Sequence, residues 1–185
     1  MTGRTEQTLG ARLRVTVHVS PLRFRLLRLR ERYPSAGASC LEDWLVDVAN
    51  ARGARIVRRR ERPDPEFTGP PAGELSDEDL VVAICALQCR DRPQMLRLAA
   101  QLVSREAVDA TRLAAVARRE RVGIVLGELA RQAVKVDSSH RLWQALLQIF
   151  GNERPPREPI LHWTRMAEAV PEHGRVNAVS WRLVA

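Results

Sequence analysis

The chain has 185 residues, an apolar fraction of 45% and a formal net charge of +8, which allow one or two folded domains and argue against disorder. No apolar run approaches the roughly 18 residues that a membrane span needs, and the first residues lack a hydrophobic stretch followed by a cleavage site. Three cysteines are too few for a disulfide scaffold. We therefore expect a cytoplasmic, unprocessed protein with no membrane partner.

The excess positive charge is confined to the first third of the chain. Residues 1–62 contain fourteen arginines and six acidic residues, a net charge of +8, whereas residues 63–185 contain sixteen basic and sixteen acidic residues. A segment this basic favours binding to a polyanion, and DNA is the polyanion we expect. Arginine also suits phosphates and guanine edges, because its planar group donates two parallel hydrogen bonds.

After a polar arm over residues 1–11, an alternating pattern predicts a β-strand over residues 12–19. One face of that strand is apolar and the other is polar. So short a strand is not stable alone, and no similar strand lies nearby, so we expect it to pair with the same strand of a second copy. The apolar positions are Leu13, Val15, Val17 and Val19, and the polar positions between them are Arg14, Thr16 and His18.

Two helices are predicted after the strand. Ser20 and Pro21 provide a helix cap and a first-turn proline, and Pro34 ends this first helix. Ser39 and Glu42 have the spacing of a capping box that begins a second helix, which a glycine at position 53 ends. The expected core positions are Leu22, Leu26, Leu29 and Tyr33 in the first helix and Leu41, Trp44, Leu45 and Val48 in the second.

The order strand, helix, helix over residues 12–53 resembles the ribbon-helix-helix family of dimeric DNA-binding proteins, the Arc and MetJ type. The resemblance implies a homodimer through residues 12–19, whose paired strands enter the major groove, and a phosphate at the start of the second helix. It implies that Arg14, Thr16 and His18 read base edges. The connection between the helices is longer than the tight turn of that family. The expected phosphate contacts are Arg12, the backbone at Ser39 and Cys40, and the arginines of the basic stretch that follows, Arg55, Arg58, Arg59 and Arg60.

A segment rich in proline and glycine, residues 63–75, predicts a linker between a basic domain over 12–62 and a second domain over 76–185. In the second domain, spacings of three and four residues predict five amphipathic helices packed as a bundle. Ser76 is the expected cap of the first of these helices, and Pro93 begins the second. The apolar stripes of the second to the fifth helix are, in order, Leu96, Ala99, Ala100 and Val103; Leu113, Val116 and Ala117; Val122, Val125, Leu126 and Leu129; and Leu142, Leu146, Ile149 and Phe150.

The chain offers no recognisable catalytic or metal site. Cys85 and Cys89 share a helical face, but no third or fourth ligand has a suitable spacing, so we expect them to fill apolar space. No histidine stands in a nucleophile motif, and His140 fits a helix start. The acids of the sequence SDED are expected at a helix N-terminus, where the helix dipole favours them. We therefore expect a protein that is not an enzyme and uses no metal or cofactor.

Together these patterns predict a mainly α protein with an N-terminal ribbon-helix-helix module, a C-terminal helical bundle and a terminal β-hairpin in the tail after residue 155. The predicted function is a dimeric, sequence-specific DNA-binding regulator whose second domain binds a partner protein or a ligand. This layout resembles antitoxins and bacterial regulators of plasmids and operons. Two alternatives remain open. One is a protein–protein adaptor that docks its basic first helix on an acidic partner, and the other is a non-catalytic subunit of an enzyme or an RNA-containing assembly.

Overall fold

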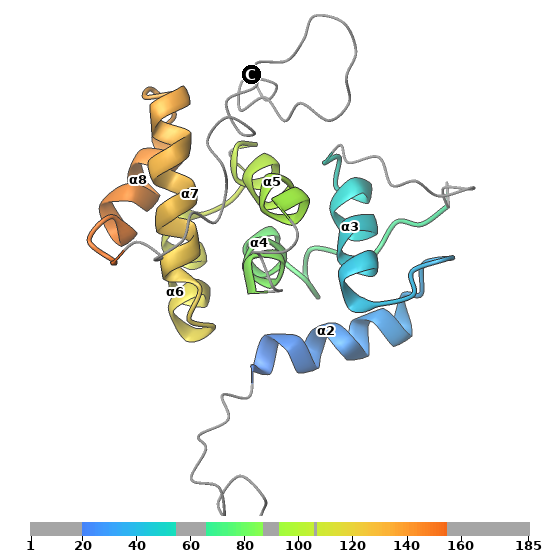
Figure 1. The fold of residues 1–185 in the computed structure, drawn as a ribbon. Helices are drawn as coiled ribbons and strands as arrows, with labels where there is room; N and C mark the ends of the chain where they lie inside the picture. The colour runs from blue at the N-terminus through green and yellow to red at the C-terminus, as the bar shows by residue number, and fades with distance from the viewer. Residues whose placement is uncertain (1–19, 55–65, 87–92, 106, 155–185) are drawn as a thin grey trace, which may run out of the picture.

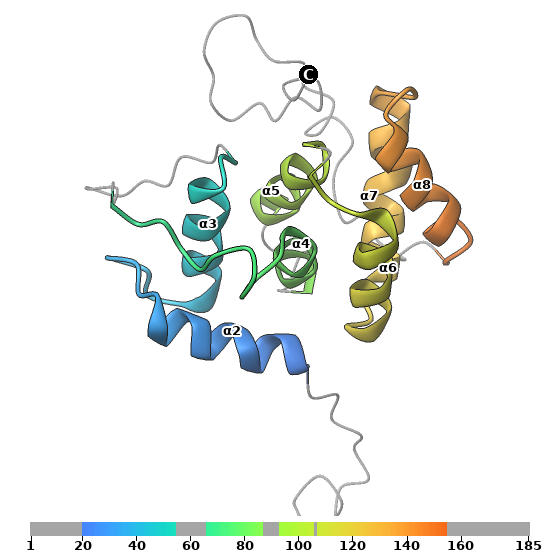
Figure 2. The same ribbon diagram turned by 180° about the vertical axis from the view of Figure 1, so that it is seen from behind.

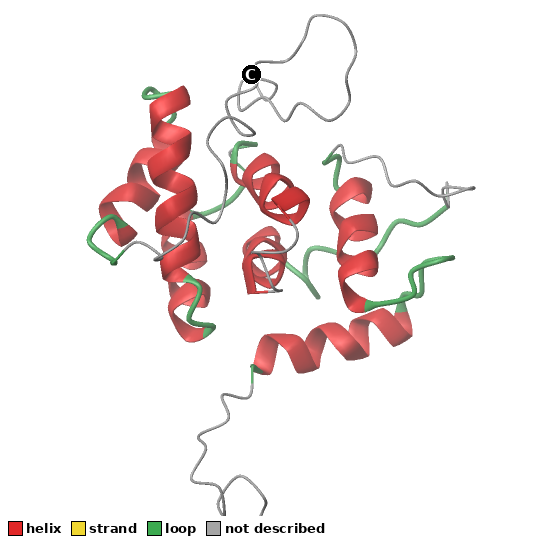
Figure 3. Cartoon of the chain, viewed as in Figure 1, coloured by secondary structure: helices red, strands yellow, loops and turns green. Residues whose placement is uncertain are grey.

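The computed structural model describes four stretches of the chain, which consist of helices and the loops that join them (Figure 3). They contain seven α-helices and no strand, which confirms the prediction of a mainly α protein. No helix in these stretches is both long enough and apolar enough to span a bilayer. The stretches are residues 20–54, 66–86, 93–105 and 107–154, and the helices are α2 (Pro21–Arg32), α3 (Leu41–Ala51), α4 (Asp77–Ala86), α5 (Pro93–Val103), α6 (Ala110–Arg119), α7 (Gly123–Val136) and α8 (Arg141–Phe150).

Helices α4 and α5 form the centre of the molecule (Figures 1 and 2). On one side α3 packs against both of them, and α2 crosses beneath α3 and α4. On the other side α6 packs against α4 and also contacts α7 and α8, which pair with each other. The predicted strand over 12–19 and the predicted terminal hairpin lie outside the described residues.

One continuous hydrophobic core includes residues of all seven helices. The apolar stripes expected from the sequence supply it, because their spacing places each stripe on a single face of its helix. Two buried tryptophans use their polar edge as well: Trp44 Nε1 donates to the Tyr33 carbonyl at 2.7 Å, and Trp143 Nε1 donates to Ser104 Oγ at 3.1 Å. Each indole therefore fills the core without leaving a buried donor unpaired.

Most of the predicted helix ends are confirmed. Ser20 Oγ accepts the backbone N–H of Arg23 at 3.0 Å, and Ser76 Oγ accepts that of Asp79 at 3.2 Å. The His140 ring accepts the N–H of Trp143 at the start of α8. Helix α3 ends at a glycine, residue 53, whose φ of 85° is the left-handed conformation that glycine adopts without strain.

The predicted capping box at Ser39 is wrong. Helix α3 begins one residue later than that pattern requires, so its cap residue is Cys40, whose side chain makes no capping hydrogen bond. Ser39 Oγ donates instead to the carboxylate of Asp43 at 2.8 Å. The shift of one residue moves Glu42 out of the position from which a capping box closes.

Part of the predicted linker is packed rather than extended. Leu75 is fully buried, and the Arg52 guanidinium donates to the carbonyls of Pro70, at 3.3 Å, and of Leu75. Helices on both sides of residues 63–75 share the same core. The predicted division into two domains is a statement about independent folding and stays a prediction.

We expect Gly127→Ala to lower the free energy of unfolding by about 1–3 kcal/mol, because overpacking strains a well-packed core. Gly127 lies where α7 meets α8, and a Cβ there would stand 2.8 Å from the Phe150 carbonyl oxygen. Urea denaturation measures the effect. Gly73→Ala is the matched control, since a Cβ at Gly73 meets nothing within 4 Å. Equal stabilities of the two variants would contradict close α7–α8 packing.

Candidate nucleic-acid interface

Helix α2 presents two different faces to solvent beside the face that it buries. Leu22, Leu26 and Leu29 face the core. A line of three arginines at spacings of three and four residues, which we call the basic edge, consists of Arg25, Arg28 and Arg32. A second line, which we call the outer stripe, consists of Phe24, Leu27 and Glu31, all exposed.

The arginines of the basic edge differ in how much charge they leave free. Arg25 pairs with Asp79 at 2.5 Å, and Arg32 pairs with Glu74 at 3.0 Å. Arg28 makes no ion pair within the described residues. Because an acid neutralises each of the other two, most of the net attraction that this edge exerts on an anion comes from Arg28, whereas Arg25 and Arg32 still turn spare N–H donors outward.

Three consecutive acids at the start of α4 bind arginines from α2, from α6 and from the residue that follows α3. Asp77 lies 2.5 Å from Arg52 at the end of α3, and Asp79 binds Arg25 of α2. Glu78, between them, lies 3.5 Å from Arg112 of α6 and also accepts the N–H of Asp109 at 3.0 Å. The sequence placed these acids at a helix N-terminus correctly, but it did not reveal their arginine partners.

A buried carboxylate fixes the first turn of α2. Glu120, whose side chain is 1% exposed, accepts the hydroxyl of Ser20 at 2.5 Å and the N–H of Leu22 at 3.3 Å. Arg119 Nε lies 3.4 Å from the same carboxylate. The contact joins residues about a hundred positions apart, and no local pattern signals it. It anchors α2 at the residue that follows the predicted ribbon.

The predicted phosphate site at Ser39 and Cys40 lies at the start of α3, as expected. The hydroxyl of Ser39 is already bound to Asp43, and Glu42 and Asp43 both occupy the first turn of α3. Those two carboxylates oppose a phosphate at this terminus. Phosphate binding here stays a prediction.

The other predicted DNA contacts lie outside the described residues. The structure therefore places none of the predicted base readers, and it adds the basic edge of α2 as a surface that the sequence had not separated from the other arginines of that helix. The residues concerned are Arg12, Arg14, Thr16, His18, Arg55, Arg58, Arg59 and Arg60.

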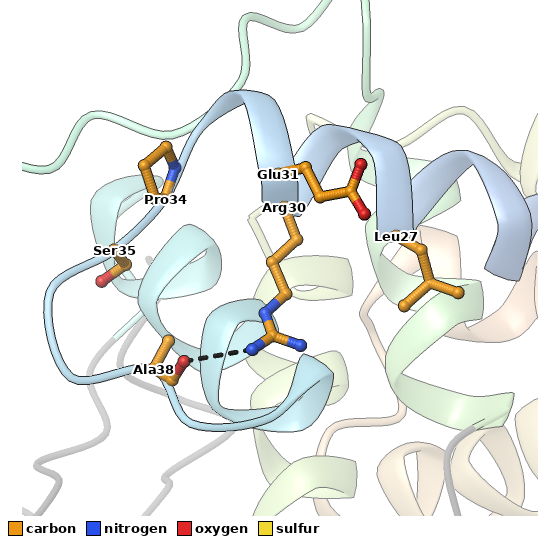
Figure 4. Close-up of a pocket in the computed structure, with 6 residues that line it drawn as sticks. All are labelled: Leu27, Arg30, Glu31, Pro34, Ser35 and Ala38. Atoms are coloured by element: carbon orange, nitrogen blue, oxygen red, sulfur yellow. Dashed lines mark hydrogen bonds between the residues drawn. The ribbon is translucent and has the colours of Figure 1, made fainter.

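A pocket of about 390 Å³ opens beside the C-terminal half of α2 (Figure 4). Its polar groups are mostly committed: Arg30 donates to the carbonyls of Ala38 and Ser39, at 3.4 and 3.1 Å, and Ser35 donates to Asp47 at 2.6 Å. Glu31 is the one acid in the pocket lining, which contains no histidine or cysteine.

A second pocket, of about 300 Å³, lies beside Arg32 and Tyr33. The Tyr33 hydroxyl donates to Glu74 at 2.8 Å, and this hydrogen bond raises the pKa of the phenol. In the loop before α8, hydrogen bonds from Ser139 lower the pKa of Asp137. Neither shift creates a general acid or base near neutral pH. Within the described residues, no group of three or more His, Cys, Asp or Glu side chains is placed to hold a metal ion.

Comparison with protein-family models, with curated proteins and with solved structures found no match to this chain.

We expect Glu120→Ala to lower the free energy of unfolding by about 1–3 kcal/mol, because the half-buried Ser20 hydroxyl and the buried N–H of Leu22 both lose their acceptor. Amides of α2 should exchange hydrogen faster, relative to those of α8. Glu120→Gln keeps an acceptor oxygen and should lower the free energy of unfolding by less than Glu120→Ala does. If hydrogen exchange in α2 is the same in Glu120→Ala as in the unmodified chain, the proposed anchor is wrong.

Proposed function

We propose that the chain is a dimeric, DNA-binding regulator that contacts DNA through its first third. The observation that carries the proposal is the basic edge of α2, which is exposed and begins a few residues after the predicted ribbon. The net charge of +8 over residues 1–62 and the resemblance of residues 12–53 to ribbon-helix-helix proteins support it.

In this proposal the work is divided between two kinds of contact. Arg28 and the arginines at 55 and 58–60 bind phosphates and release counterions, which supplies affinity for any sequence. Arg14, Thr16 and His18 read base edges in the major groove, where a guanine offers two acceptors to one guanidinium. The anchor between Ser20 and Glu120 would hold the ribbon in a fixed position relative to the basic edge.

One observation favours the second candidate function, a protein–protein adaptor. The exposed apolar side chains of Phe24 and Leu27 lie on the same helix as the basic edge, and a phosphate backbone offers them nothing to pack against. An adaptor with no DNA role would show no salt-dependent affinity for a duplex.

We expect Arg28→Gln in the full chain to weaken binding to all duplexes alike and to reduce the slope of log K against log salt by about 0.9, the value for one phosphate contact. Fluorescence anisotropy with a labelled random duplex over a range of salt concentrations measures both quantities. Arg141→Gln is the matched control, because Arg141 is also exposed but lies at the start of α8, on the other side of the molecule (Figure 1). An unchanged slope for Arg28→Gln would remove the basic edge from the interface, and a chain without any salt-dependent affinity would overturn the proposed function.

We expect Arg14→Ala to cost about 1–3 kcal/mol on a duplex selected from a random pool by the unmodified chain, because one bidentate contact to a guanine is lost. On random duplexes the same variant should lose little binding affinity. Competition binding with the selected and the random duplex separates the two effects. Equal losses on both would mean that the predicted strand does not read sequence.

A further inference from the structure

The outer stripe of α2 includes an apolar patch, formed by Phe24 and Leu27, that the rest of the described structure leaves uncovered. Phe24 is 61% exposed and Leu27 is 39% exposed. The two side chains are three residues apart on one helix, so they lie side by side. The one other large hydrophobic side chain that is exposed among the described residues, Ile124, stands on α7. Adjacent exposed apolar side chains on one helix face are typical of a contact surface.

The charges that flank this patch have opposite signs at its two ends. Arg23 stands four residues before Leu27, and Glu31 stands four residues after it. Both are exposed, and neither makes an ion pair within the described residues. Eight residues separate them along the helix, twice the spacing at which side chains of one helix pair. Each therefore has an unused charge directed at solvent.

We propose that the outer stripe binds the outer stripe of a second copy of this chain, with the two α2 helices antiparallel. A two-fold axis at Leu27 then brings Arg23 of each copy to Glu31 of the other and packs the two apolar patches together. A parallel pair would instead place like charges opposite each other, so the charges select the antiparallel arrangement. A two-fold contact of this kind uses the same surface on both copies, which a single self-complementary stripe can provide.

The pocket beside the C-terminal half of α2 fits this arrangement. Leu27, Glu31 and Pro34 contribute to its lining, and its other polar groups are bound within the chain (Figure 4). In the antiparallel pair, the N-terminal half of the partner helix faces this pocket, and that half carries Arg23 and Phe24. On each side of the two-fold axis, side chains from the N-terminal half of one α2 helix thus face the pocket beside the other.

The contact uses a different line of α2 from the surface proposed for DNA. Arg25 and Arg32 stay clear of it, whereas Arg28, four residues after Phe24, lies at its border. The contact is also separate from the ribbon of residues 12–19, through which the proposed function expects dimerisation. Because one helix from each copy gives a small interface, we expect a dissociation constant on the order of micromolar for this contact alone.

Sedimentation velocity on the full chain, over a range of concentrations, tests the inference. Leu27→Glu should weaken self-association roughly tenfold or more, because it places a charge in the apolar centre of the contact. Arg23→Glu and Glu31→Arg should each weaken it about tenfold, since attraction becomes repulsion at two symmetric positions. The double variant that exchanges the two charges should recover most of the loss. Ile124→Glu, on α7, is the control and should change nothing.

Val17→Pro separates this contact from the proposed ribbon, because a proline removes a hydrogen bond from a strand ladder. The inference is supported if Val17→Pro still associates and its association is lost on adding Leu27→Glu. It is overturned if the chain is monomeric, or if Leu27→Glu and the charge variants associate as the unmodified chain does. Salt-dependent duplex binding, measured on the same samples, reports on the proposed DNA function independently of either result.

Discussion

The arrangement of the helices depends on the acidic first turn of α4. Asp77, Glu78 and Asp79 lie at the positive end of a helix dipole. They bind Arg52, which follows α3, Arg112 of α6 and Arg25 of α2 in turn. The side chains of Glu78 and Asp79 are only 8% exposed, and removing the arginine partner of a buried carboxylate is strongly destabilising. Arg25 and Arg112 reach these acids from the surface, whereas Arg52 is largely buried and also donates to the carbonyls of Pro70 and Leu75. The start of α4 is thereby linked to three other parts of the helical core.

For α2 this constraint decides which faces are available. Arg25 bound to Asp79, and Ser20 bound to Glu120, hold the helix in the rotation that turns Leu22, Leu26 and Leu29 inward. What remains outside is the basic edge on one side and the outer stripe on the other. The basic edge is suited to bind a polyanion, and the outer stripe is suited to bind a protein surface. The two proposals therefore use different parts of the same helix. Because Asp79 neutralises Arg25, the proposed DNA contact would depend chiefly on Arg28 and on the arginines outside the described residues.

Local chemistry made much of the fold predictable. The caps at Ser20, Ser76 and His140 depend on a hydrogen bond to a residue three positions away, which a sequence displays directly. The buried stripes are equally local, because helical spacing alone assigns them to one face. The capping box at Ser39 failed by a single residue, since two neighbouring positions compete for the same role and packing decides between them. The predicted ribbon and terminal hairpin lie outside the described residues, and the ribbon-helix-helix reading stays a proposal.

By itself the sequence determined that the described part of the chain is mainly helical, where several of its helices begin, and which of their faces are apolar. Only the tertiary structure decided which charges serve the fold and which remain free. Arg25 and Arg28 look alike in the sequence, yet one is bound to a buried aspartate and the other makes no ion pair in the part of the chain that the structure describes. Glu120 resembles any surface glutamate, yet it is buried against the first turn of α2. The reason is that an ion pair or a buried hydrogen bond depends on a distance between residues far apart in the chain, and that distance exists only once the helices have packed.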